Sequence, residues 1–186
     1  FNMLTGVYQP TIGEIFFEDK KISGLLPHQI AGKCVARTFQ NIRLFKKLSV
    51  FDNVRIGADI CNKYGLLDAV FQVPSFHRHE DDVAALSHKL LKIFDLDGRA
   101  DELALNLPYG AQRRLEIARA MATGAKLLLL DEPAAGMNHQ ETHELMQTIC
   151  KIQKDFDLTI LLIEHDMKLV MGISEKIVVL DYGVKI

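Results

Sequence analysis

Two adjacent carboxylates follow a run of leucines in the stretch "LLLLDEP", residues 127–133. The apolar run predicts a buried strand that ends at Asp131 and Glu132. One carboxylate there could bind a hydrated magnesium ion and the other could activate an attacking water, the two tasks that phosphoryl transfer requires. Taken alone, the stretch also fits a strand that ends in polar residues and a proline turn.

A glycine turn opens a predicted helix in "LPYGAQRRLEIARAM", residues 107–121. Unpaired N–H groups at a helix N-terminus form an anion site, so the turn at Gly110 is a candidate for phosphate contact. The alternative is an ordinary glycine turn before an amphipathic helix whose arginines, Arg113, Arg114 and Arg119, form a solvated face.

Single polar residues follow two further strands, Gln40 in "RTFQN" and His165 in "LLIEHDM". The amide of Gln40 could contact a metal ion or a water, and the imidazole of His165 could hydrogen-bond a phosphate oxygen. Each would be unremarkable alone, because a single histidine is more often structural. His139 with His143, and the stretch "HRHEDD" at residues 77–82, could bind a metal but are expected to be exposed helix positions.

Short apolar stretches alternate with helical ones over much of the chain. Strands are predicted at residues 34–39, 126–130, 158–164 and 176–180, and helices at 109–122, 139–156 and 167–171, the second with Asn138 and Glu141 as a capping box. This alternation indicates a parallel sheet covered on both faces, so the predicted fold class is α/β. Ligands of such sheets bind beyond the carboxyl ends of the strands, where Gln40, Asp131, Glu132 and His165 fall.

Shorter elements are predicted in the first half of the chain. Residues 1–4 resemble the back half of a helix, residues 14–17 and 21–22 a hairpin that turns at Asp19 and Lys20, and Pro27 the start of a helical turn. From about residue 45 to 106, helical segments broken by Gly65, Pro74 and Gly98 indicate an inserted subdomain. One segment has a single apolar stripe, made of Val83, Leu86, Leu90, Leu91, Ile93 and Phe94.

Composition narrows the class of protein. The 186 residues carry a net charge of -2, which gives no electrostatic argument for binding nucleic acid or an anionic membrane. Three cysteines, far apart and without a Cys-x-x-Cys pair, are typical of a reducing cytoplasm. The longest apolar runs are far shorter than the roughly 20 residues that cross a bilayer.

The four motifs together indicate one protein family far more specifically than any one of them does. "RTFQN", "YGAQRRLEIARAM", "LLLLDEPAAGMN" and "LLIEHDM", in this order, resemble the Q-loop, signature motif, Walker B with D-loop, and H-loop of ATP-binding cassette (ABC) ATPases. The resemblance covers essentially the whole chain and is strongest to the ATP-binding subunits of branched-chain amino acid transporters. It implies a P-loop NTPase-like cassette with a partial ATPase core at 1–44, a helical subdomain at 45–106 and further core at 107–186.

The resemblance also implies a role for each matching residue. Gln40 and Asp131 would bind Mg²⁺, Glu132 would be the general base, and His165 would contact the γ-phosphate of ATP. The signature residues Tyr109, Gly110 and Gln112 would face the nucleotide on an opposing subunit, while residues 134–138 would form the D-loop.

By the same resemblance, the protein would be the nucleotide-binding subunit of an importer that couples ATP hydrolysis to uptake of branched-chain or similar amino acids. Its implied partners are integral-membrane permease subunits, a second ABC ATPase of the same or a paralogous kind, and indirectly a substrate-binding protein, with no nucleic acid. The implied location is the cytoplasmic face of a bacterial inner membrane. The alternative is a cassette acting on nucleic acid or the ribosome, which the compact helical segment and slightly acidic charge disfavour.

The sequence departs from the family pattern in two ways. Pro108 stands where the signature usually has serine, and Ala111 where it often has glutamine. No G-x-x-x-x-G-K-[ST] phosphate loop occurs in the 186 residues, since "GKC" at residues 32–34 has Pro27 at the position of the first glycine and precedes a strand. The opening "FNMLTGVYQPTIG" resembles the text that follows this loop in the family, so we expect a piece of a longer protein.

The first prediction concerns this 186-residue chain by itself. Because it lacks the phosphate-binding amides and lysine of that loop, it should neither bind ATP tightly nor hydrolyse it. Release of phosphate by the purified chain in the presence of ATP and Mg²⁺ would contradict this expectation.

Overall fold

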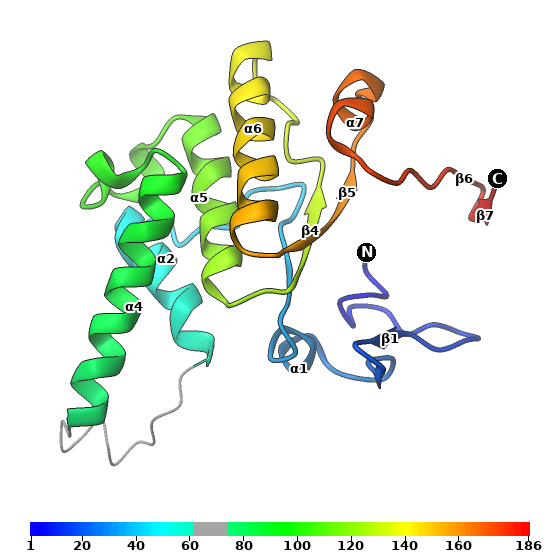
Figure 1. Ribbon diagram of the computed structural model, residues 1–186, viewed down its shortest axis with the longest axis horizontal. Coiled ribbons are helices and arrows are strands. Elements are labelled where there is room, and N and C mark those ends of the chain that lie inside the picture. The colour runs from blue at the N-terminus through cyan, green and yellow to red at the C-terminus, as the bar shows by residue number, and fades with distance from the viewer. Residues whose placement is uncertain (62–73) are drawn as a thin grey trace.

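The core of the protein is a three-stranded parallel sheet. The computed structural model describes residues 1–61 and 74–186, so the predicted break at Gly65 lies outside the described residues. The strand order is β3 (Val35–Arg37), β4 (Leu127–Asp131) and β5 (Thr159–Ile163), with β4 parallel to both neighbours. The predicted α/β fold class is therefore confirmed, and Figure 1 shows the helices packed beside the sheet.

Helices precede and follow these strands along the chain. They are α1 (Pro27–Ala31), α2 (Val50–Ala58), α4 (Pro74–Ile93), α5 (Tyr109–Ala122), α6 (His139–Asp155) and α7 (Met167–Ile173), with single 3₁₀ turns at Asp59–Cys61, Asp97–Arg99 and Ala104–Asn106. The capping box predicted for α6 is present, because Asn138 Oδ1 accepts from the Glu141 N–H at 2.9 Å and Glu141 Oε2 accepts from the Asn138 N–H at 3.1 Å.

Side-chain alternation along β4 divides the core into two clusters. Leu128 and Leu130 pack with the buried residues of the helices, among them Leu115 of α5 and Leu145 of α6. Alternate residues of a strand point to opposite faces, and Leu129 accordingly belongs to a second cluster on the other side of the sheet. The larger cluster lies on the helical face.

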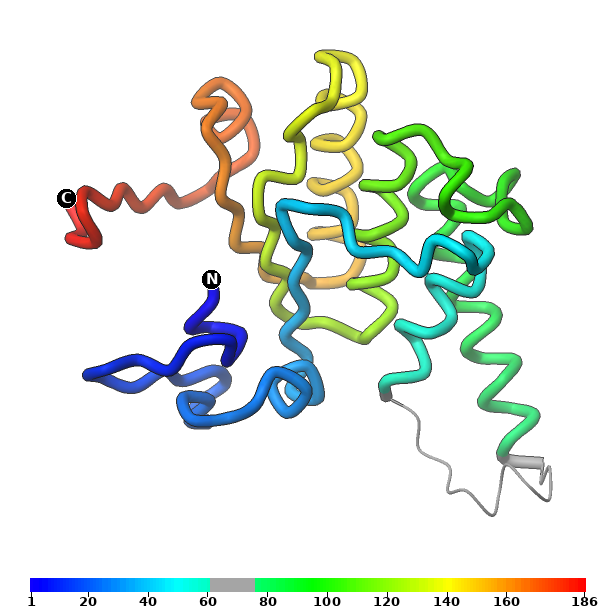
Figure 2. The backbone as a smooth tube through the Cα atoms, turned by 180° about the vertical axis from the view of Figure 1, so that it is seen from behind, coloured from blue at the N-terminus to red at the C-terminus, as the bar shows by residue number. Residues whose placement is uncertain are grey.

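The second face of the sheet is covered only in part. Ile22, Ile30 and the partly buried Phe1 pack against the outer side of β3 and β4, where the N-terminal segment lies in Figure 2. Toward β5 this cover ends, since Leu161 is 43% exposed and Ile163 is 38% exposed. The expectation of a sheet covered on both faces therefore fits β3 and β4 but not β5.

The N-terminal segment differs from its predicted elements. Residues 1–6 form hydrogen-bonded turns instead of the end of a helix, with the Thr5 N–H donating to the Phe1 carbonyl at 3.1 Å. The hairpin of β1 (Phe16–Phe17) and β2 (Lys20–Lys21) turns at Glu18 and Asp19, one residue earlier than predicted. Both turn residues have positive φ, 48° and 60°, which matches the twist of the two strands.

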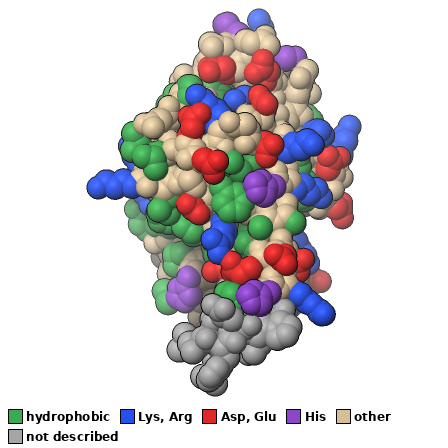
Figure 3. Space-filling view, turned by 90° about the vertical axis from the view of Figure 1, so that its left-hand side faces the viewer, with side chains coloured by type: hydrophobic (Ala, Val, Ile, Leu, Met, Phe, Trp, Pro, Cys, Tyr) green, Lys and Arg blue, Asp and Glu red, His purple; other side chains and the backbone are tan. Residues whose placement is uncertain are grey.

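The predicted helical region is built around α2 and α4, which pack on each other and on α5. Pro74 is the first residue of α4, where its fixed φ suits the first helical turn. The predicted stripe is the buried side of this helix: Val83, Leu90, Leu91 and Phe94 are buried, while Leu86 and Ile93 are partly buried. Basic (Lys, Arg) and acidic (Asp, Glu) side chains are interspersed on the face of the molecule shown in Figure 3.

The prediction of a strand at residues 176–180 is wrong. Instead, β6 (Leu180–Asp181) pairs with β7 (Val184–Lys185) in a separate antiparallel hairpin. Tyr182 and Gly183, with φ of 45° and 82°, form the turn that folds this segment back on itself and away from the sheet.

None of the helices among the described residues is long and apolar enough to span a membrane.

The close packing of α2 on α5 yields a prediction at Gly57. A Cβ atom added there would lie 2.4 Å from the carbonyl oxygen of Arg119, a backbone atom that cannot rotate away. We expect Gly57→Ala to lower the free energy of unfolding by about 1–3 kcal/mol, as overpacking does. Gly98→Ala is the control, because a Cβ there meets no atom within 4 Å. Equal urea midpoints for the two variants would contradict the prediction.

Candidate functional site

The carboxyl ends of the three strands bring together Gln40, Glu132 and His165. Gln40 donates through Nε2 to Glu132 Oε2 at 3.1 Å, and His165 Nε2 lies 2.8 Å from Glu132 Oε1. The Glu132 side chain is 21% exposed and that of His165 is 79% exposed, so the group is open to a ligand from solution. These three residues were predicted to meet at this edge, and they do; we name them the edge triad.

The backbone of Glu132 has an uncommon conformation. Its φ of 47° lies in the left-handed region, which residues other than glycine rarely adopt. The Glu132 N–H donates to the Ile163 carbonyl at 3.0 Å, and the Glu132 carbonyl accepts from the Ala135 N–H at 3.1 Å. Such strain persists where surrounding contacts impose it, and it concentrates at functional sites. Here it turns the chain sharply at the carboxylate.

Asp131 lies next to the edge triad but pairs with a different partner. Its Oδ2 is 2.8 Å from Nη2 of Arg37, and both side chains are largely buried. The same guanidinium donates to Asn2 Oδ1 at 2.6 Å and contacts Thr5 Oγ1 at 3.3 Å. Arg37 therefore ties the N-terminal segment to the end of β4 and engages one oxygen of the predicted metal ligand.

The oxygen donors at this edge could supply only part of the coordination shell of a magnesium ion. A carboxylate of Asp131 and an amide oxygen of Gln40 are hard ligands of the kind that Mg²⁺ prefers. Residues 1–61 and 74–186 contain no group of three or more His, Cys, Asp or Glu side chains that could enclose a metal ion. Mg²⁺ commonly needs only one or two protein ligands when phosphates and water complete its shell. By donor chemistry alone, the two side chains suit a metal ion that arrives with nucleotide.

The predicted signature residues lie at the start of α5. Gln112 donates through Nε2 to the Leu107 carbonyl at 2.8 Å, so its amide closes the helix start locally. A Cβ on Gly136 would lie 3.1 Å from Cε1 of Tyr109, and one on Gly110 would lie 2.8 Å from Glu141 Oε1. Tyr109 and Gly110 therefore adjoin the predicted D-loop and the start of α6.

Arg113 is the most important residue that the sequence did not reveal. Instead of lying on a solvated face, its side chain is fully buried. It donates through Nη1 to the Phe39 carbonyl at 2.6 Å and to Glu116 Oε2 at 2.9 Å, and through Nη2 to the carbonyls of Gln40 at 2.9 Å and Glu132 at 3.2 Å. The available signal was an Arg–Glu pair three residues apart on an apolar helix face.

Glu164 is a second such residue. Its carboxylate accepts from the Ala134 N–H at 3.0 Å through Oε1 and from the His165 N–H at 3.3 Å through Oε2. One side chain thereby links the residue after β5 to the beginning of the predicted D-loop. The position of His165 therefore depends on the loop that follows β4.

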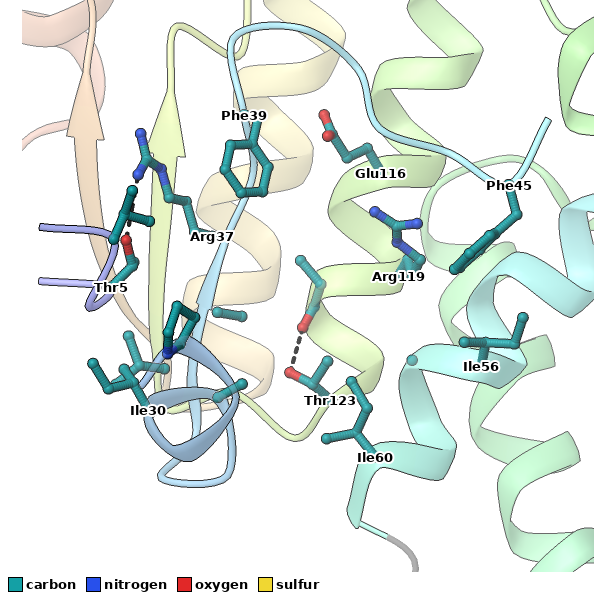
Figure 4. Close-up of a pocket in the computed structure, with 17 residues that line it drawn as sticks. Thr5, Ile30, Arg37, Phe39, Phe45, Ile56, Ile60, Glu116, Arg119 and Thr123 are labelled. Atoms are coloured by element: carbon teal, nitrogen blue, oxygen red, sulfur yellow. Dashed lines mark hydrogen bonds between the residues drawn. The ribbon is translucent and has the colours of Figure 1, made fainter. Parts of the chain in front are cut away.

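A pocket of about 390 Å³ lies between β3 with α1 and the helices α2 and α5. Figure 4 shows Phe39 and Ile30 on one side of it and Phe45, Ile56 and Ile60 on the other. Arg119 also lines the pocket; it donates to the Arg43 carbonyl, and burial lowers the pKa of its guanidinium. Because this pocket includes Phe39 and Phe45, it adjoins both ends of the segment that contains Gln40.

Comparison with known proteins identifies the family to which this architecture belongs. Residues 1–135 match the sequence profile of the ABC transporter family. The chain belongs to the ABC transporter family, and the prediction made from the four motifs is confirmed.

Its similarity to particular relatives extends over nearly the whole chain. The high-affinity branched-chain amino acid transport ATP-binding proteins LivG of Escherichia coli (strain K12) and BraF of Pseudomonas aeruginosa are each 46% identical over 183 residues, 98% of this chain and 72% of the relative. The crystal structure of the ADP conformation of an ATP-binding cassette of an ABC transporter matches 100% of this chain and 72% of its own, with a TM-score of 0.80 and 28% identity. The predicted likeness to branched-chain subunits is confirmed as well.

Proposed function

We propose that this chain is the nucleotide-binding subunit, or part of it, of an importer that couples ATP binding and hydrolysis to uptake of branched-chain or similar amino acids. The observation that supports this most directly is the edge triad, in which Gln40 and His165 both contact the carboxylate of Glu132. The names of the relatives at 46% identity supply the transported class.

In this proposal Glu132 is the general base. Its carboxylate would accept a proton from the attacking water, while Gln40 and His165 hold it in one orientation by their hydrogen bonds to its two oxygens. Asp131 and Gln40 would hold Mg²⁺, which, when bound, supplies charge neutralisation for the phosphates of ATP. His165 would then be within reach of the γ-phosphate, because its exposed ring lies beside Glu132.

The proposed partners are integral-membrane permease subunits, a second ABC ATPase, and indirectly a substrate-binding protein. The subunit would lie at the cytoplasmic face of the membrane as a peripheral component. In support of a second ATPase, the signature residues Tyr109 and Gly110 lie together at the start of α5, beside Gly136 and Glu141. In the proposed head-to-tail dimer these signature residues would face the nucleotide on the other cassette.

The pocket beside Gln40 is the proposed docking groove for the permease. The side of the pocket formed by α2 and the residues before and after it is apolar, and its side chains Phe45, Ile56 and Ile60 are exposed. Exposed apolar side chains that line a concavity are typical of interaction sites. A permease segment seated there would contact Phe39 and Phe45, on either side of Gln40.

Glu132→Gln tests the hydrolytic role in the full-length protein assembled with its permease. The substitution keeps the size of the side chain but removes its basicity and replaces one acceptor oxygen by an NH₂ donor, so the ATPase rate should fall by about 10²–10⁴-fold while ATP binding is retained. Phosphate release and equilibrium nucleotide binding are the measurements. Glu102→Gln, at an exposed glutamate of the helical region, is the control. Unchanged turnover in Glu132→Gln would exclude this role.

Ile56→Asp tests the docking groove. A charge on this exposed wall should weaken co-purification of the full-length subunit with its permease by about tenfold or more, since an unpaired carboxylate would lose its water on docking. Ile12→Asp is the matched control, because Ile12 is 92% exposed and does not line the pocket. Equal permease binding by both variants would argue against docking at this groove.

A further inference from the structure

We infer that Arg113 is a positioning residue that fixes the edge triad through its backbone and links it to the docking groove. The inference rests on the proposed function, since it concerns how that site is held in place. Its basis is that a single buried guanidinium binds the carbonyls of Phe39, Gln40 and Glu132, residues from the ends of two different strands.

The geometry of the contact requires arginine. Nη1 and Nη2 point to three carbonyl oxygens and one carboxylate at 2.6–3.2 Å, and the planar guanidinium presents these donors in a fixed arrangement. A lysine ammonium is a compact group on a flexible stem and cannot span the same acceptors with the same angles. Because Arg113 reaches the carbonyls of both Gln40 and Glu132, it sets the separation of the backbones that carry two members of the edge triad.

Glu116 extends this connection toward the groove. Its Oε2 binds Arg113, and its Oε1 accepts from the Arg43 N–H at 3.0 Å. Arg43 in turn stacks over the ring of Phe39 at 4.2 Å, and its carbonyl accepts from Arg119 in the groove. The segment that a permease would contact is thereby bound, through one carboxylate, to the residue that holds Glu132.

The far end of this segment is held as well. Asn53, fully buried on α2, donates to the Phe45 carbonyl at 3.1 Å and accepts from the Phe45 N–H at 2.9 Å. Phe45 is therefore fixed to the helical region while Phe39 and Gln40 are fixed to α5 through Arg113. A displacement of α2 relative to α5 would pull on the segment between them and so on the edge triad.

Burial of the ion pair alone would not establish this role. Replacing a buried pair by apolar residues is often neutral for stability, whereas removing one partner is costly. The distinguishing property of Arg113 is that its acceptors include the backbone of the proposed base. A positioning role therefore predicts a change in turnover that is separate from nucleotide affinity and from folding.

The decisive experiment compares Arg113→Lys with Arg99→Lys in the full-length protein assembled with its permease. Arg99 pairs with Glu102 at the same three-residue spacing, but both side chains are about 40% exposed. Arg113→Lys should lower kcat for ATP by about tenfold to a hundredfold with the KM for ATP within twofold, as for a misplaced catalytic group. Arg99→Lys should leave both unchanged. In folded Arg113→Lys, an unchanged kcat, or a fall in kcat matched by an equal loss of ATP binding, would overturn the inference.

Glu116→Gln decides the question if Arg113→Lys fails to fold. The amide keeps an acceptor for Arg43 but weakens the anchor of Arg113, so kcat should fall by a smaller factor, about twofold to tenfold, with KM unchanged. Unchanged kcat would overturn the inference. The wild type and Glu132→Gln are measured alongside: if the wild type shows no ATPase, the proposed function has failed, whereas active wild type with active Arg113→Lys defeats only the role of Arg113.

Discussion

The arrangement of the site depends on one buried guanidinium. Taking the charge of Arg113 out of water is costly unless its donors are paired. Here the Glu116 carboxylate and three backbone carbonyls accept from Nη1 and Nη2, while the buried Nε has no hydrogen-bond partner among the described residues. The carbonyls come from Phe39 and Gln40, after β3, and from Glu132, after β4. The loops that follow β3 and β4 are thus held together by hydrogen bonds to one side chain.

The parallel sheet supplies the other half of the constraint. Its register places Leu129 opposite Arg37 and Asp131 opposite Ile163, so the polar residues that follow each strand emerge at one level. Because alternate residues point to opposite faces, Asp131 lies on the side of Arg37, while the residue after it must turn sharply. The positive φ of Glu132 is that turn, and it separates the two carboxylates into different surroundings.

Much of this structure was predictable because local and tertiary preferences agree. The bounds of α5, the capping box of α6 and the meeting of Gln40, Glu132 and His165 all follow from local pattern and strand topology. The prediction of a strand at residues 176–180 was wrong because apolar β-forming residues specify extended backbone but no partner. The turn at Tyr182 and Gly183 gives Leu180 a local partner, and residues 176–179 form no strand. Arg113 was missed because the sequence of a helix does not show which polar side chain meets the backbone of a distant loop.

Helix α5 has a second consequence for the proposed dimer. Arg113 holds Glu132 of its own chain from the second turn of this helix, and Tyr109, one turn earlier at the first residue of α5, lies beside Gly136. If the signature contacts nucleotide on an opposing cassette, then two successive turns of one helix carry that contact and the anchor of the local base. A rotation of α5 that closes one site would therefore shift the carbonyl of Glu132 in the other. The two sites would be coupled by the stiffness of the first two turns of α5, without a longer chain of intermediates.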